Sequence, residues 1–399
     1  MDISTIIAFT VYLAVVLGIA LAAWHVTRNL SDFVLGGRRL GGAVAALSAG
    51  ASDMSAWLLL GLPGLAFADG MSAIWLPIGL TVGAYFNWLW VAKPLRVYTE
   101  IANDSLTIPA FLSNRFKENV RSIRVIAAIS TLIFFAFYTA SGLVAGALLM
   151  KKTFGLDYQT ALFVGTAIIV AYTFVGGFLA VSWTDFVQGT LMLICLLVVP
   201  VVAMNAMGGF TPTMLKLHDL APDALHVFEG LDVLTFFNLM AWGLGYFGQP
   251  HILVRFMAVT SPKEIPLARR ICMGWMSLSM LAAMACGIVG LAYFDGKLDD
   301  VETVFIHMSS SLLTPWLAGV VMAAILSSTM CAIDSQMLAS SSALTEDLYH
   351  VIVRPKATNK ELMWVGRAGV MVISALAISL ALQPNSTVLG LVGFAWAGL

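Results

Sequence analysis

The sequence predicts an all-α integral membrane protein, and three observations support this fold class. Of the 399 residues, 60% are apolar and only 11% are charged, whereas a soluble domain carries about 25% charged residues. The chain divides into apolar segments, most of them long enough to cross a bilayer as a helix. Basic residues concentrate in every second connection between these segments. This composition excludes an ordinary soluble enzyme, a disordered chain and, with a net charge of −1, a nucleic-acid-binding protein with a basic face.

Eleven segments are expected to be helical. Length, apolarity and glycine content favour helices over β-barrel strands, which are shorter and alternate in polarity. No basic stretch precedes the first segment, so we expect a retained span rather than a signal peptide. The expected segments are residues 5–24, 40–67, 71–92, 123–150, 159–179, 182–207, 231–257, 268–293, 312–349, 363–382 and 387–399.

The distribution of basic residues predicts the orientation of the chain in the membrane. Seventeen of the 21 basic residues are assigned to four alternate connections. By the positive-inside rule these connections face the cytoplasm and the N-terminus lies outside the cell membrane. The four groups are Arg28, Arg38 and Arg39; Lys93, Arg96, Arg115, Lys117, Arg121 and Arg124; Arg255, Lys263, Arg269 and Arg270; and Arg354, Lys356, Lys360 and Arg367.

Two segments contain residues that interrupt a membrane helix. The second segment has a small, polar run at residues 48–55 (SAGASDMS) followed by residues 61–64 (GLPG). The seventh has residues 242–250 (WGLGYFGQP). Glycine and proline weaken a helix interior. For either segment alone, close helix packing through small residues is an equal alternative.

The two interrupted segments lie five segments apart, so they cross the membrane in opposite directions. Such a pair is typical of secondary transporters built from an inverted repeat, whose substrate site lies between the broken helices near the midplane. We therefore expect a first span and cytoplasmic connection at 1–39, one five-helix repeat at 40–207, an extracellular connection at 208–230 and a second repeat at 231–399.

Three acidic residues within the segments are candidate ion ligands. A lone carboxylate inside the bilayer costs at least about 2.5 kcal/mol, so Asp53 is expected to bind a cation or a substrate amine, and a backbone hydrogen bond is the alternative. Carbonyl groups of Ala51 and Met54 offer further oxygen ligands. Asp334 is expected to hold a cation or a proton, or to bond another helix. Asp185 is a third candidate ion ligand, and capping the start of its helix is an equal alternative.

Aromatic residues inside the segments are candidate contacts for a small organic solute. Trp57, Tyr138, Trp242 and Tyr246 lie within segments, three of them beside the interruptions. Interfacial belts and packing explain most other tryptophans and tyrosines. His251 has no partner pattern and is expected to be structural. No Walker loop, dinucleotide turn or HExxH motif is present, so nothing indicates ATP-driven transport or common enzymatic chemistry.

At these residues the sequence resembles the sodium:solute symporter family, and within it the bacterial sodium/proline symporters. The resemblance implies a LeuT-type 5+5 inverted repeat preceded by one extra span, and import of L-proline coupled to sodium. It extends over essentially the whole chain. The matching stretches are residues 35–41 (LGGRRLG), 46–55 (ALSAGASDMS), 138–142 (YTASG), 176–185 (GGFLAVSWTD), 242–251 (WGLGYFGQPH) and 341–349 (SSALTEDLY).

The resemblance also implies roles for individual residues. The first set would contact the substrate: Ser55, Trp57, Tyr138, Trp242, Tyr246 and Pro250. The second set would serve the principal sodium site: Ala51, Asp53, Met54 and Ser328. The third set would serve a further sodium site that some family members have: Asp185, Asp334 and Ser335.

The sequence departs from the family pattern at the principal sodium site. Two adjacent hydroxyl residues of that site are replaced by Cys331 and Ala332, and hard cations prefer oxygen ligands to a thiol. Sodium would then bind with fewer protein ligands or nearer Asp334, and proton coupling is an alternative. Another small solute and a symporter-like sensor module are further alternatives. Besides the lipid bilayer, neither a nucleic acid nor a protein partner is expected.

The last apolar segment, residues 387–399, is shorter than a bilayer crossing. Family members continue further, so the resemblance implies that the final helix of the second repeat and the C-terminal part of the protein are incomplete in this chain.

Overall fold

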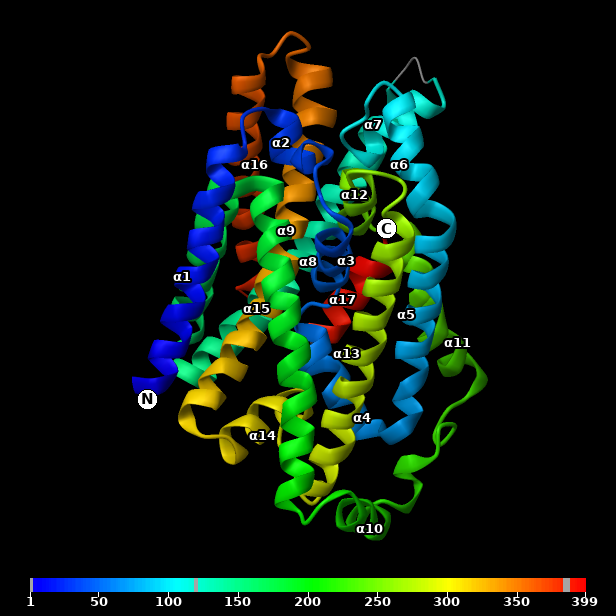
Figure 1. Ribbon diagram of the computed structural model, residues 1–399, viewed down its shortest axis with the longest axis vertical. Coiled ribbons are helices and arrows are strands. Elements are labelled where there is room, and N and C mark those ends of the chain that lie inside the picture. Colours follow the sequence, from blue (N-terminus) through cyan, green and yellow to red (C-terminus); the bar gives the residue numbers. More distant parts are fainter. Residues whose placement is uncertain (1–2, 118–120, 383–387) are drawn as a thin grey trace.

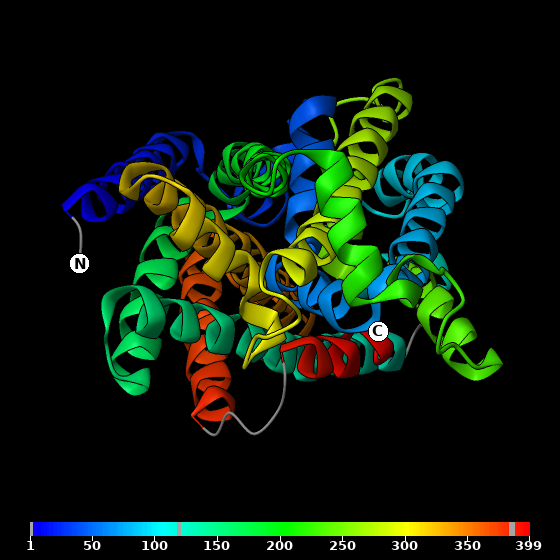
Figure 2. The ribbon, with the colours of Figure 1, turned by 90° about the horizontal axis from the view of Figure 1, so that it is seen from below.

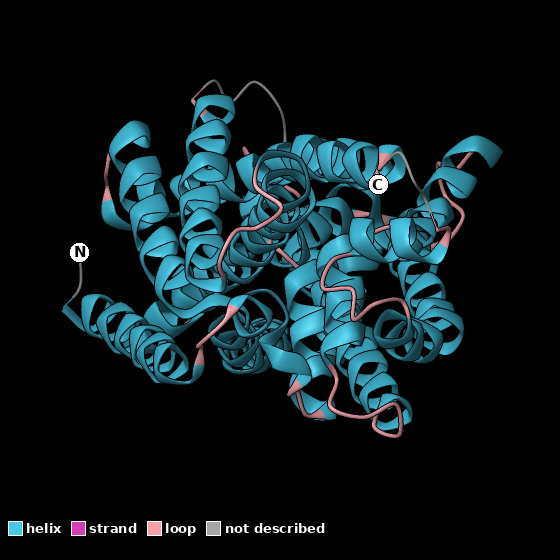
Figure 3. Ribbon diagram, turned by 90° about the horizontal axis from the view of Figure 1, so that it is seen from above, coloured by secondary structure: helices cyan, strands magenta, loops and turns pink. Residues whose placement is uncertain are grey.

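The computed structural model describes residues 3–117, 121–382 and 388–399. Within these ranges the chain consists of helices and connecting loops and contains no β-strand (Figure 3). Seven helices among the described residues are long and apolar enough to cross a membrane. The predicted all-α membrane fold is therefore confirmed.

Most expected segments correspond to long helices with slightly different ends. The eleventh segment forms the ten-residue helix α17 (Val388–Ala397), and its expected first residue, 387, lies outside the described residues. The third segment is α5 (Trp75–Phe86), η4 (Asn87–Val91) and α6 (Ala92–Ile101). Besides the continuous helical run Trp57–Ile101, which contains the third segment, the long helices are α1 (Ile3–Val26), α8 (Ser122–Phe154), α9 (Tyr158–Ala206), α13 (Ile265–Tyr293), α15 (Pro315–Ser342) with its π-helical extension η8 (Ala343–Val353), and α16 (Asn359–Ala381).

Helix α9 contains both the fifth and the sixth expected segments. Gly177 interrupts it with φ 62° and ψ −157°, a conformation that a residue with a side chain rarely adopts. A Cβ at Gly177 would also lie 2.7 Å from the ring of Phe33 in α2 (Leu30–Leu35). The chain reverses here, because α2 lies at the upper end of the molecule whereas α10 (Phe210–Leu220), which follows α9, lies at the lower end (Figure 1).

The four basic connections meet at the upper end of the molecule. Short helices α2 and α7 (Ile108–Arg115) lie there, whereas α10 and α14 (Val304–Leu312) lie at the lower end (Figure 1). Arg38 Nη2 lies 2.9 Å from Asp104 in the second connection, and Arg38 Nη1 donates to the carbonyl of Met257 at 2.8 Å. Arg124 Nη2 reaches Glu346 at 3.0 Å. The connections predicted to share one side of the membrane therefore do lie together.

Three of the basic residues assigned to connections are instead buried in helices. Arg96 is 4% exposed in α6, and its Nη2 donates to the carbonyl of Thr260 at 3.3 Å. The side chain of Arg255 is 1% exposed in α12 (Pro250–Ala258). Arg367 is 4% exposed in α16, with its guanidinium carbon 4.3 Å from the ring centroid of Trp24 and 5.1 Å from that of Trp364. Their assignment to connections was wrong, because a count of basic residues cannot tell a surface charge from one that is paired or stacked inside the bundle.

Both predicted helix interruptions are present. In the second segment, α3 (Gly42–Asp53) ends at Met54, whose ψ is 67°. The chain then continues as η2 (Trp57–Gly61) and α4 (Leu62–Asp69). Residues 61–64 do not break the helix, because the preceding π-helical turn places Pro63 in the first turn of α4, where its missing N–H is tolerated.

The seventh segment is divided in the same manner. It consists of α11 (Val233–Ala241), the 3-10 helix η6 (Trp242–Phe247) and α12, with Gln249 extended at ψ 107° before α12. Helix α12 packs against α3, and η6 packs against α5. Helix α17 packs against η6 and α8, and Figure 2 shows it (red) lying along α8 (teal). The two interrupted segments are therefore neighbours in the middle of the bundle.

Glycines permit the closest of these contacts. A Cβ at Gly83 of α5 would lie 2.0 Å from the carbonyl oxygen of Gly243, and one at Gly243 would lie 2.1 Å from that of Gly79. These atoms belong to backbones, so neither side can yield by changing a rotamer.

We expect Gly83→Ala to separate α5 from η6 and to lower the stability of the protein by about 1–3 kcal/mol, as overpacking does elsewhere. Gly18→Ala is the matched control, since nothing lies within 4 Å of a Cβ at that position of α1. Thermal unfolding of both variants in detergent measures the difference. An unfolding temperature for Gly83→Ala equal to that of the control would contradict this packing.

Candidate substrate and ion site

The interruption of the second segment leaves a backbone carbonyl that aromatic side chains satisfy. Asp53 is the last residue of α3, and its carbonyl accepts hydrogen bonds from Trp57 Nε1 at 3.1 Å and from the Tyr138 hydroxyl at 3.3 Å. Breaking a helix removes the intrahelical partners of such carbonyls. The donors come from η2 itself and from α8, so the break is held by a second helix.

The side chain of Asp53 joins the two interrupted segments. Its carboxylate accepts a hydrogen bond from the hydroxyl of Tyr246 in η6. Asp53 is 1% exposed and Tyr246 is 3% exposed. The contact therefore closes the interface between the two broken segments.

Four of the six expected substrate residues gather around this contact. Ser55, Trp57, Tyr138 and Tyr246 are all buried at the break. The other two lie on its flanks. Trp242 lines an open pocket of about 440 Å³ beside Trp396, whose Nε1 donates to the Trp242 carbonyl at 2.7 Å.

Pro250, the sixth expected residue, faces two further cavities. One of about 450 Å³ lies between α6, α7, α8 and α12. A second, of about 30 Å³, has both Arg255 and Ser335 in its wall. The cavities on this side extend from the second interruption toward α7, which lies at the basic end of the molecule.

The two halves of the expected principal sodium site meet, and a thiol lies between them. Cys331 Sγ of α15 donates to the carbonyl of Ala51 at 2.9 Å and lies 3.4 Å from that of Ser328. Met54, whose carbonyl was the third expected ligand, is the first residue of the break. Ala332 offers only a methyl group. Backbone oxygens suited to a sodium ion are therefore present, but the side chain between them is a weak ligand for a hard cation.

Asp185, expected at the further sodium site, pairs with the buried guanidinium of Arg255. Its Oδ2 accepts from the Ser48 hydroxyl at 2.6 Å and from Arg255 Nη2 at 3.2 Å. The same Nη2 donates to the Ser335 hydroxyl at 2.5 Å, and Nε donates to Ser48 at 3.0 Å. The guanidinium thus lies between two of the residues expected to bind a further ion and links α3, α9, α12 and α15.

Asp334 extends this polar network to the other half of α9. Its Oδ2 accepts from the Tyr172 hydroxyl at 2.6 Å, and its Oδ1 accepts from the Ser335 hydroxyl at 3.2 Å. Neither Tyr172 nor Arg255 was identified as a site residue from the sequence. The signal that could have identified Arg255 is a charged residue inside the apolar run 250–258, whereas nothing distinguished Tyr172 from other tyrosines within the segments.

The buried polar core contains more acid than base. Asp53, Asp185 and Asp334 are each no more than 1% exposed, and Arg255 is the basic residue bonded among them. Fully ionised, this set has a formal charge of −2. Uncompensated charge is very costly at low dielectric, so the set favours bound cations or protons.

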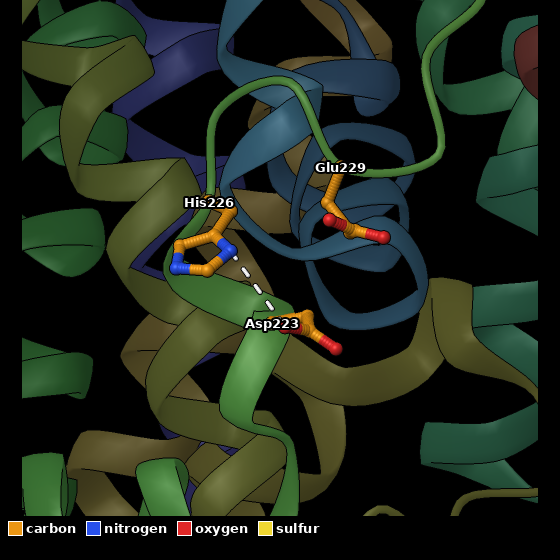
Figure 4. A group of neighbouring side chains, drawn as sticks. All are labelled: Asp223, His226 and Glu229. Atoms are coloured by element: carbon orange, nitrogen blue, oxygen red, sulfur yellow. Dashed lines mark ion pairs between the residues drawn. The ribbon is translucent and has the colours of Figure 1, made fainter.

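A separate group of metal-binding residue types lies on the lower end of the molecule. Asp223, His226 and Glu229 follow α10, and one ligand atom from each lies within 4.8 Å of the others (Figure 4). His226 Nδ1 is 3.6 Å from Asp223 Oδ1. All three residues are exposed, and exposed acidic groups commonly gather without a metal, so we assign no function to this group.

Two interrupted helices that meet at a buried, acidic site inside a bundle of membrane-length helices define a secondary transporter. Residues 33–399 match the sodium:solute symporter family, and the chain belongs to that family.

Named relatives and a solved structure agree with this membership. The chain is 51% identical over 379 residues to the high-affinity proline transporter PutP of Bacillus subtilis, which covers 94% of this chain and 80% of the relative. It is 48% identical over 407 residues to the sodium/proline symporter of Escherichia coli, which covers 100% of this chain and 81% of the relative. A structure of a sodium-coupled sialic acid symporter, 19% identical, matches with a TM-score of 0.83 over 96% of this chain and 82% of that chain. This last likeness shows a shared fold.

We expect Arg255→Gln to abolish stable folding or transport, because it leaves the Asp185 carboxylate buried without its counter-charge, a change that costs about 3–5 kcal/mol. The double variant Arg255→Gln with Asp185→Asn removes both charges and should recover most of the lost stability. Protein amount in the membrane and the unfolding temperature of the purified protein measure the coupling in a double-mutant cycle. Strictly additive effects of the two substitutions would show that the pair does not interact.

Proposed function

We propose that this protein is a secondary active transporter of the inner (cytoplasmic) membrane that imports L-proline together with sodium. The contact that carries this proposal is the one between Asp53 and Tyr246, which joins both broken helices beside the carbonyls of Ala51 and Ser328. Relatives at 48–51% identity are a proline transporter and a sodium/proline symporter. These observations together favour a site for a small amino acid and a cation at the same interruption.

We further infer that the chain is organised as two inverted repeats, residues 40–207 and 231–399, with residues 1–39 and 208–230 outside them. Leu40, which precedes α3, forms backbone hydrogen bonds with the end of α12: its N–H donates to Ala258 at 3.1 Å, and Thr260 donates to its carbonyl at 2.9 Å. The start of one interrupted segment thus lies beside the end of the other. This supports opposite directions of crossing, as an inverted repeat requires.

The substrate residues in this proposal are Ser55, Trp57, Tyr138, Trp242, Tyr246 and Pro250. Aromatic rings at the break shield the solute, and the acidic core offsets its ammonium group. Sodium is held by the carbonyls of Ala51, Met54 and Ser328 with the charge of Asp53 nearby. By bridging α3 and α15 it would favour the arrangement of the break that also completes the solute pocket.

Coupling then follows from differential affinity. Each ligand must bind one conformation better in the presence of the other, since a ligand with equal affinity for both states shifts nothing. The cavities beside Pro250 extend toward the end that carries the basic connections. With that end in the cytoplasm and the N-terminus outside, they mark the route by which the solute and the ion leave.

The decisive experiment is initial uptake of labelled L-proline into proteoliposomes across a grid of sodium concentrations and pH values. We expect uptake to require an inward sodium gradient and to persist with a protonophore present. Competition by a panel of small carboxylates identifies another solute if proline is not the preferred one. An initial rate of proline uptake that depends on neither sodium concentration nor pH would overturn the proposal.

Proton coupling is a second candidate, and the contacts of Cys331 favour it. The thiol bonds to one backbone oxygen of the expected sodium site and lies close to another, and Asp334 with Tyr172 forms a buried pair that can hold a proton. In this case Asp334, Ser335 and Asp185 bind the coupling proton rather than a further sodium ion. Uptake would then survive removal of sodium and collapse with a protonophore.

We expect Cys331→Ser with Ala332→Thr to lower the sodium concentration that gives half-maximal uptake by about tenfold or more, because two hydroxyl oxygens replace a thiol and a methyl group near the carbonyls of Ala51 and Ser328. Cys195→Ser, a buried cysteine of α9 that lies in neither ion group, is the matched control. An unchanged sodium dependence in the double variant would place the coupling ion elsewhere, near Asp334.

A further inference from the structure

His251 is fully buried, and neither nitrogen of its ring has a hydrogen-bond partner among the described residues. A neutral imidazole has one donor and one acceptor. Burying both without partners costs the free energy of two unmade hydrogen bonds, and native proteins rarely leave such groups unpaired. The ring therefore offers one donor and one acceptor to a ligand that binds beside it.

The ring lies between the two interrupted segments. His251 is the second residue of α12, directly after the extended Gln249. Its ring packs edge-on against Tyr138, with centroids 6.0 Å apart, and against Phe135 at 5.3 Å. Tyr138 is the residue whose hydroxyl bonds to the Asp53 carbonyl. The imidazole is therefore next to a wall of the proposed substrate pocket.

Neighbouring polar groups are already engaged with other partners. Arg255 Nη1 donates to the backbone carbonyl of His251 at 2.6 Å, while its other nitrogens bond to Ser48, Asp185 and Ser335. The Asp53 carboxylate accepts from Tyr246. These contacts hold the residue in place and leave its ring nitrogens available.

The position of His251 indicates which part of a solute it would meet. The N-terminus of a helix carries partial positive charge and favours anions, and α12 has nine residues. Asp53, at the end of α3, is negative and favours an ammonium group. A zwitterionic amino acid placed between the two helices would therefore direct its carboxylate toward α12 and its amine toward α3.

Building on the proposed function, we propose that the His251 imidazole is a substrate-recognition residue that donates a hydrogen bond to the carboxylate of the transported amino acid. It adds to the aromatic residues a polar group that distinguishes an amino acid from a plain cyclic amine. This role differs from the structural one expected from the sequence, where His251 had no visible partner.

Two substitutions separate recognition from packing. His251→Phe keeps an aromatic ring against Phe135 and Tyr138 but removes both nitrogens, whereas His251→Gln keeps a donor and an acceptor but loses the ring. His251→Leu, which also lacks polar atoms, replaces the phenylalanine variant if that variant does not reach the membrane. His218→Gln, at an exposed position of α10, is the matched control.

The measurement is the KM and maximal rate of labelled L-proline uptake in proteoliposomes at saturating sodium, normalised to the amount of protein. We expect His251→Phe to raise the KM at least tenfold, the effect of losing a hydrogen bond to a charged group, with a much smaller rise in His251→Gln. A KM within twofold of wild type in the phenylalanine variant overturns the proposal. A rise in KM for His251→Gln that equals or exceeds the rise for His251→Phe also overturns the proposal, because that order indicates a packing role for the ring.

Wild type measured alongside keeps the two proposals separable. If wild-type protein does not take up proline, the proposed function fails, and the same variants are compared with the carboxylic solute that the competition panel identifies. If wild-type uptake is normal and the variants show the wrong order, only the role of His251 fails.

Discussion

A helix interrupted inside a membrane must have its freed carbonyl groups satisfied by other parts of the protein, because lipid offers no donors. Here the donors are side chains from the interrupted segment itself and from the neighbouring helices α8 and α15. Trp57 and Tyr138 bond to the Asp53 carbonyl, and Cys331 bonds to that of Ala51. The packing of α15 against α3, and the contact of Tyr138 from α8 with the end of α3, meet this requirement. The place where the second segment breaks is therefore also the place where the bundle is held together.

The same region has too few positive charges for its acids. Arg255 bonds to Asp185 directly and contacts Ser335, whose hydroxyl bonds to Asp334, while Asp53 has only the Tyr246 hydroxyl on its carboxylate. A buried charge without a partner is so costly that a bound cation or proton stabilises the folded protein directly. In the proposed mechanism, ion binding would be linked by this free energy to the contact between the two interrupted helices, which is what coupled transport requires.

Local pattern predicted much of the fold, and its failures have a common cause. Apolar length located the segments, and the glycine-rich run at 242–250 marked an interruption that the structure contains. The pattern failed at residues 61–64, where a π-helical turn lets the helix continue past Pro63. It also failed at Arg255, which was counted as a surface charge. Whether a proline or an arginine is tolerated inside a helix depends on neighbours distant in the sequence, and hydropathy does not contain that information.

The sequence by itself determined the class of the protein: composition required a membrane, segment length required helices, and Asp53 in an apolar segment indicated a costly charge in need of a partner. Only the tertiary structure decided how these residues are combined. It placed Cys331 between two carbonyls, set the guanidinium of Arg255 among residues expected to bind an ion, and left the ring of His251 without a partner. The reason is physical: the apolar character of a segment can be read from its own residues, whereas its hydrogen-bond partners come from helices between 70 and 280 residues away in the chain.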